Sequence, residues 1–166
     1  MRKTFFLGVG RWLTAAVIGF FLLRMLFSGG SADVPFETVT NAVVQTVDLS
    51  ETKTADAQMV RRLYGLDPAD YAGCVLYYPA QSMGVTELLL VRVQDKTQID
   101  AVKTAMQARL SGQEAVFAGY APEQYALCQN GSAVSVQGLD VLFLISADKD
   151  AAVRAFRAVH SGRAGA

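Results

Sequence analysis

The chain has 166 residues, of which 52% are hydrophobic and 18% charged, a composition that supports a packed core and excludes extended disorder. Four of its fifteen basic residues precede residue 30 and all fifteen acidic residues follow it, so the remainder carries 11 basic against 15 acidic residues, a net charge of −4. Such an acidic domain is a poor partner for nucleic acid, which requires a basic face.

Residues 12–27 form an apolar segment that predicts a membrane helix. Their only charged residue is Arg24, whose long side chain can reach the headgroups from the outer end of the helix. Sixteen helical residues span about 24 Å, slightly less than the roughly 30 Å hydrocarbon core. Arg2, Lys3 and Arg11 precede this segment, and basic flanks stay in the cytoplasm. We therefore expect a single-pass membrane protein with a cytoplasmic N-terminus and an extracytoplasmic domain.

A cleaved signal peptide is the alternative interpretation of this segment. The small residues that end at Ala32 resemble a cleavage region, and cleavage there would release a secreted protein. The long basic front and the position of Arg24 favour retention of the helix as an anchor. A lipoprotein is excluded by the lack of any cysteine before Cys74.

The predicted organisation has four parts: residues 1–27 as cytoplasmic start and anchor, 28–35 as linker, 36–160 as an extracytoplasmic domain, and 161–166 as a tail. Two helices open the domain. The first places Phe36, Val39, Val43 and Val47 on one face, and the second ends at Gly65, ahead of Pro68.

The order strand–strand–helix then occurs twice. Strands are expected over 74–78 and 87–93, and a capping box over 97–100 opens a helix that runs toward Phe117. A loop and a short helix are expected over 120–129, with a turn at Asn130-Gly131. Strands over 133–137 and 141–146 flank Gly138, and the last helix starts near Asp148 and turns Val153, Phe156 and Val159 or His160 inward.

The order α-α-β-β-α-β-β-α predicts an α/β domain of the α+β type, with two layers and a four-stranded antiparallel sheet. Strands 87–93 and 141–146 are apolar along their whole length rather than alternating. Both faces of the sheet should therefore be covered, and the N-terminal helix pair is a candidate for the second face.

The residues that most often carry chemistry form no catalytic, cofactor-binding or metal-binding pattern. Cys74 and Cys128 are the only cysteines, and in an exported domain they either form a disulfide or remain buried thiols. They lack the additional ligands that a metal site needs. His160, the sole histidine, is expected at a helix end.

Tyrosines are the remaining candidates for a binding surface. Tyr77, Tyr78, Tyr120 and Tyr125 could line a groove that binds a peptide or glycan. Alternatively, they are half-buried residues at the edge of the core, the more frequent role of aromatic side chains.

Several short motifs resemble those of one bacterial family. They are Leu63-Tyr-Gly-Leu-Asp67, Glu87 ahead of an apolar strand and Asp95, Tyr120-Ala-Pro-Glu123, Asn130, and Gly138 before the strand at 141–146 and Asp148. Together they resemble domain-of-unknown-function family 4358, over roughly residues 36–158. The resemblance implies a bacterial, extracytoplasmic domain behind a lipoprotein signal or membrane anchor, and it brings no established activity, ligand or catalytic residue.

The leading hypothesis is a non-enzymatic module of the bacterial envelope. It would be held in the membrane by residues 12–27 and would bind an envelope protein or peptide. An envelope hydrolase with paired carboxylates and a carrier of a small ligand or peptide are the alternatives.

Overall fold

The computed structural model describes residues 34–162. Its helices are α2 (Phe36–Val44), α3 (Ala57–Tyr64), α4 (Ile99–Phe117), α5 (Pro122–Gly131) and α6 (Lys149–His160), with 3-10 turns at Pro68–Asp70 and Lys96–Gln98. Its strands are β1 (Thr52–Thr54), β2 (Gly73–Pro79), β3 (Glu87–Arg92), β4 (Ser132–Gln137) and β5 (Asp140–Ile145). The predicted α+β class is confirmed.

The strands form one five-stranded antiparallel sheet in the order β1-β2-β3-β5-β4. The prediction of four strands was wrong because β1 carries no hydrophobic signal. Its three residues, Thr-Lys-Thr, are polar, and the strand pairs with the end of β2, where Thr52 lies opposite Pro79. Its backbone hydrogen bonds to β2, and not a hydrophobic pattern, make this segment a strand.

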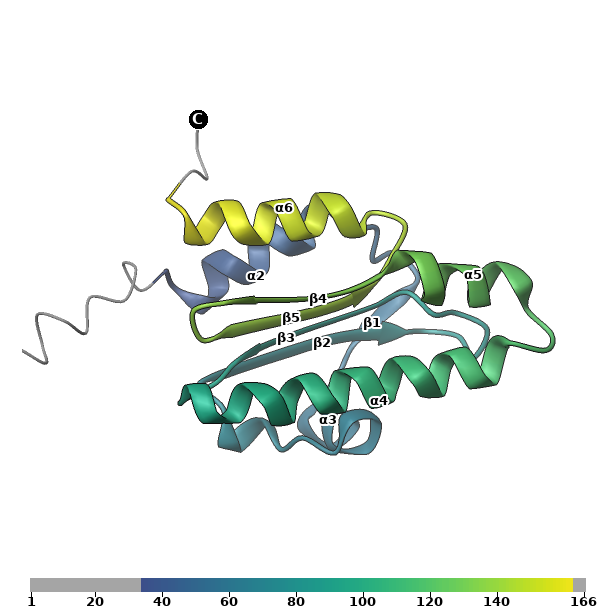
Figure 1. Ribbon diagram of the computed structural model, residues 1–166, viewed down its shortest axis with the longest axis horizontal. Coiled ribbons are helices and arrows are strands. Elements are labelled where there is room, and N and C mark those ends of the chain that lie inside the picture. Colours follow the sequence, from purple (N-terminus) through teal and green to yellow (C-terminus); the bar gives the residue numbers. More distant parts are fainter. Residues whose placement is uncertain (1–33, 163–166) are drawn as a thin grey trace, which may run out of the picture. The chain divides into compact units, whose positions relative to one another are not determined.

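Helices cover both faces of the sheet, so the domain has three layers rather than the two predicted (Figure 1). Leu89, Val91 and Phe143 pack on one face together with buried residues of α3, α4 and α5. On the other face, leucines of β3 and β5 pack with buried residues of α2 and α6. The N-terminal helix pair is thus divided, since α2 lies on one side of the sheet and α3 on the other.

Helix ends follow local capping chemistry. The Asp56 side chain accepts a hydrogen bond from the Met59 amide at the start of α3, and Gly65 ends that helix at φ 68°, as predicted. Before α4, the capping box is formed by Asp95 and Gln98 and not, as predicted, by residues 97–100. The helix runs on through Gly112 to Phe117.

The second half differs from the prediction mainly around α5. Asn130 and Gly131 form the last turn of this ten-residue helix and are not a separate turn. The tight connection is instead at Gly138, whose φ of 61° suits the short loop between β4 and β5. In α6, Phe156 and Val159 are buried as predicted, whereas Ala152 takes the fully buried place expected for Val153.

No helix within residues 34–162 is long and apolar enough to cross a membrane. The anchor predicted at residues 12–27 lies outside the described residues, as does most of the tail predicted after residue 160.

Candidate functional site

A buried carboxylate at the start of β3 organises three elements. Glu87 is fully buried and receives hydrogen bonds from the Tyr64 hydroxyl on α3 and the Arg109 guanidinium on α4. Arg109 binds with two nitrogens, Nε at 3.0 Å from Oε1 and Nη2 at 2.7 Å from Oε2. This fork geometry fixes the guanidinium plane as well as its position.

Burial and charge both act on the partners of Glu87. Burial, and next the charge of Glu87, raise the pKa of Tyr64 well above its usual value, so the phenol remains a hydrogen-bond donor in alkaline solution. Burial alone would lower the pKa of Arg109, but the hydrogen bonds and charge of Glu87 outweigh it and raise that pKa. Arg109 therefore stays positively charged beside the buried carboxylate of Glu87.

A second buried acid joins elements on the opposite face. Asp140, at the start of β5, accepts hydrogen bonds from Arg92 Nε and Nη2, both at 2.7 Å. His160 Nε2 lies 2.9 Å from Asp140, and its Nδ1 lies 2.8 Å from the Phe156 carbonyl oxygen. Arg92 also lies over the Phe36 ring, 5.5 Å from its centre. These contacts hold α2 and α6 on the sheet.

The two buried carboxylates do not converge. Glu87 lies opposite Ile145 at one end of the β3–β5 ladder, whereas Asp140 lies opposite Arg92 at the other end. They also contact helices on opposite faces, α3 and α4 for Glu87 and α6 for Asp140. Among residues 34–162, no group of three or more histidines, cysteines or acids is placed to hold a metal ion.

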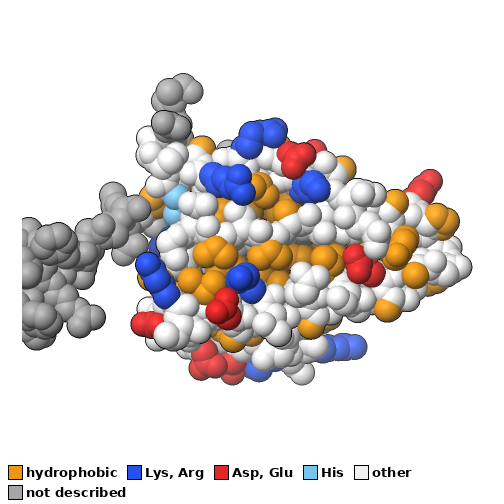
Figure 2. All heavy atoms as spheres, in the orientation of Figure 1, with side chains coloured by type: hydrophobic (Ala, Val, Ile, Leu, Met, Phe, Trp, Pro, Cys, Tyr) orange, Lys and Arg blue, Asp and Glu red, His pale blue; other side chains and the backbone are white. Residues whose placement is uncertain are grey.

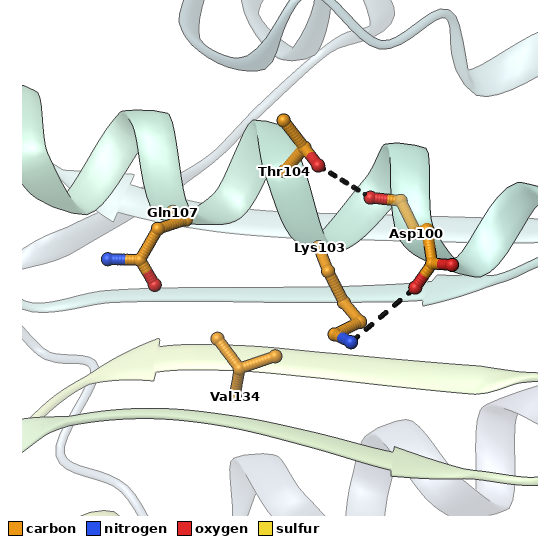
Figure 3. A pocket seen from close by; sticks show the side chains of 5 residues that line it. All are labelled: Asp100, Lys103, Thr104, Gln107 and Val134. Carbon is orange, nitrogen blue, oxygen red and sulfur yellow. Dashed lines mark hydrogen bonds and ion pairs between the residues drawn. The ribbon is translucent and has the colours of Figure 1, made fainter.

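The sheet has two edge strands in the described domain, β1 and β4, and the longer free edge is that of β4, residues 132–137. This strand pairs with β5 on one side and with no strand of the described domain on the other. Val134 is 38% exposed and lies over a depression of about 370 Å³ that α4 residues also line (Figure 3). On this face, hydrophobic side chains run between charged side chains over α6 and over α4 (Figure 2).

The family model described as a domain of unknown function, DUF4358, matches residues 45–146, more than half of the chain. The chain belongs to the DUF4358 family. The matched region is shorter than the predicted 36–158 and leaves out α2 and α6. Searches of curated proteins and of solved structures gave no significant match.

Both cysteines of this DUF4358 chain are free thiols. Cys74 is half-buried on β2, and Cys128 is buried in α5. Burial raises the pKa of the Cys74 thiol to about 11 and also raises that of Cys128. In residues 34–162 the two cysteines are thus separate thiols, one half-buried and one buried.

The four tyrosines proposed as a binding surface do not share one surface. Tyr77 and Tyr78 are neighbours on β2, so their side chains pack on opposite faces of the sheet. Tyr125 is half-buried against the same core cluster as Tyr78, and Tyr120 is 57% exposed with its ring 5.7 Å from that of Phe117. Tyr77, Tyr78 and Tyr125 are therefore half-buried residues at the edge of the core, and Tyr120 is not.

Sequence reasoning missed the Tyr64–Glu87–Arg109 cluster. Glu87 was noted only as the residue that opens an apolar strand, although an acid followed by four buried hydrophobic residues requires a buried partner. Arg109 lies one position before Leu110, on the border of the apolar stripe of α4. A charged residue at that position of the helix was the sequence signal that could have predicted a buried ion pair.

Proposed function

We propose that this DUF4358 protein is a membrane-tethered, extracytoplasmic and non-enzymatic module that binds an extended segment of another protein along the free edge of β4. The basic residues before the apolar segment 12–27 support the tether and its orientation. The free edge supports the binding mode, known as β-augmentation, in which a peptide adds a strand to a sheet.

The observation that carries the proposal is the lack of protection on β4. Its sequence, Ser-Ala-Val-Ser-Val-Gln, has no charge and no proline, the features with which proteins usually prevent pairing at a sheet edge. The opposite edge is different, because β1 has three residues and includes Lys53. An unprotected edge of six residues in a soluble domain is typical of a binding site.

The register shows which backbone groups are available. The Ser146 amide donates to the Gly131 carbonyl oxygen, so odd-numbered residues of β4 bond to β5 along the ladder. The N–H and C=O groups of Val134 and Val136 therefore point away from the sheet. An added strand would bond to these groups and place its facing side chains at the depression beside α4 (Figure 3).

Charge favours a different polypeptide over a second copy of this chain. Pairing of two β4 edges around a twofold axis perpendicular to the sheet would place α6 beside α6 and α4 beside α4. Exposed Arg154 and Arg157 on α6 would then approach their own counterparts, whereas Lys103 on α4 is paired with Asp100. We therefore infer a partner segment with an uncharged centre and acidic flanks.

The test uses a synthetic peptide with a Thr-Val-Thr-Val-Thr centre and two glutamates at each end, and a matched peptide with lysines at the ends. Amide shifts measured by NMR should concentrate on β4, and the acidic peptide should bind about tenfold more tightly. Val134→Pro removes an outward N–H without breaking a bond to β5 and should abolish binding. The control Val134→Thr keeps that N–H and should bind.

Three results would contradict the proposal. They are unchanged binding by the Val134→Pro variant, shifts by both peptides that avoid β4, and concentration-dependent dimerisation through β4 in place of peptide binding.

A further inference from the structure

A hollow of about 290 Å³ lies between α3, α4 and the loop that joins β2 to β3. It is a different site from the free edge of β4, because none of its lining residues belongs to β4. Its lining residues are Met59, Arg62, Leu63, Tyr78, Pro79, Gln81, Ser82, Gly84, Arg109 and Gln113. Two of them are arginines and none is acidic. Glu87 balances the charge of Arg109, so Arg62 supplies the net positive charge of the hollow.

Gln113 is the feature of this hollow that the fold does not explain. It is only 7% exposed, yet its side-chain amide forms no hydrogen bond with any residue of the described domain. No buried side-chain nitrogen or oxygen of residues 34–162 lacks a hydrogen-bond partner, so the amide atoms of Gln113 reach solvent inside the hollow. A ligand in the hollow would replace that solvent and bond to an amide that no other side chain uses.

Arg109 offers a second unused donor at the same place. Glu87 occupies its Nε and Nη2, which leaves Nη1 without a partner in residues 34–162. The side chain is 18% exposed, so the guanidinium reaches the hollow. The two bonds to buried Glu87 fix its position. Such a fixed donor loses little conformational entropy when it binds a ligand.

We propose that the hollow binds a small carboxylate ligand of about the size of an acylated amino acid or dipeptide. The carboxylate accepts hydrogen bonds from Arg109 Nη1 and the Gln113 amide, and exposed Arg62 supplies the positive charge that Glu87 does not balance. Met59 and Leu63 supply an apolar wall for the remainder of the ligand. The volume is close to the lower end of the range for small-molecule sites, roughly 300 Å³.

The test compares an N-acetylated dipeptide that has a free carboxylate with its C-terminal amide and with sodium acetate. Binding is followed by NMR through the side-chain resonances of Gln113 and Arg109. The free acid should shift both resonances and bind about tenfold more tightly than the amide. Acetate alone should bind more weakly than the dipeptide acid, because it does not reach the apolar wall.

Two variants separate binding from folding. Gln113→Leu removes the amide but keeps a side chain of similar size, so it should weaken binding of the acid about tenfold without lowering the melting temperature. Arg62→Gln should weaken binding without a change in melting temperature. The control Arg154→Gln removes an exposed arginine from α6, on the other face of the sheet, and should leave binding unchanged.

Several results would overturn the proposal. They are equal affinity for acid and amide, unchanged binding by the Gln113→Leu variant, a lower melting temperature of that variant, and no shift of either side chain with millimolar acid. An acetate affinity equal to that of the dipeptide acid would also contradict it, because the site would then bind any carboxylate without using its apolar wall.

Discussion

Glu87 illustrates how one residue depends on several segments of the chain. Its carboxylate is fully buried, and its partners come from α3 and α4, 23 and 22 positions away in the sequence. Removal of one member of such a buried pair typically costs about 3–5 kcal/mol, because the other charge is left unpaired. By contrast, the Arg61–Asp67 pair has side chains 49% and 41% exposed and should contribute less than about 1 kcal/mol.

The Tyr64→Phe substitution tests the cluster at the residue scale. It removes the hydroxyl that donates to Glu87 but keeps the ring, which lies edge-on to Phe143 at 6.2 Å. A hydrogen bond to a charged group contributes about 1.5–3 kcal/mol, so the free energy of unfolding at pH 8 should fall by that amount. Urea denaturation of both proteins measures the difference.

The same difference should depend on pH with a definite sign. Tyr64 ionises near pH 10 in the unfolded chain and at higher pH in the folded domain. Its contribution to stability is therefore complete below pH 10 and is lost as the pH rises from 10 through the folded-state pKa. The two unfolding free energies should converge in that range. A difference that stays constant or grows would contradict the assignment, and Tyr120→Phe, at an exposed tyrosine, is the control.

At the scale of elements, the two edges of the sheet differ in length and composition. β1 adds three polar residues to β2, whereas β4 is six residues long and continues directly from α5. The connection leaves β4 firmly paired to β5 on one side only. This asymmetry is why the proposed strand addition is assigned to β4 and not to β1.

Hydrogen exchange should show an alternation along β4. The amides of Ala133 and Ser135 bond to β5, whereas those of Val134 and Val136 point away from the sheet. The outward amides should exchange on the order of 100-fold faster, because they need no opening of the ladder. NMR-detected exchange of the free domain measures this directly. Equal protection at Val134 and Ser135 would mean that this edge is covered.

At the scale of the whole molecule, the proposal requires the domain to lie outside the cytoplasmic membrane. A tag at the C-terminus should be digested by protease added to intact protoplasts, and a tag at the N-terminus should be protected. Replacement of Arg2, Lys3 and Arg11 by glutamate should reduce export, because the basic flank sets the orientation. A C-terminal tag that becomes accessible only after lysis would contradict the proposed topology. A shortened product without the N-terminal tag would indicate cleavage near Ala32.

The local pattern of the sequence determined most of the elements of the domain. Hydrophobic periodicity and the residues that end helices and strands predicted α3 up to Gly65, the apolar strands β3 and β5, and the long helix α4. These predictions succeeded because each depends on neighbours within a few residues. The family was likewise recognisable from short motifs in order.

Only the tertiary structure decided how these elements combine. β1 has no apolar residue, so its pairing with β2 could not be read from the sequence. The division of α2 and α3 between two faces, and the separation of Tyr77 from Tyr78, depend on which side of the sheet each helix covers. A hydrophobic stripe shows that a helix is buried, but it does not show against which surface. For the same reason, the meeting of Tyr64, Glu87 and Arg109 required the folded chain.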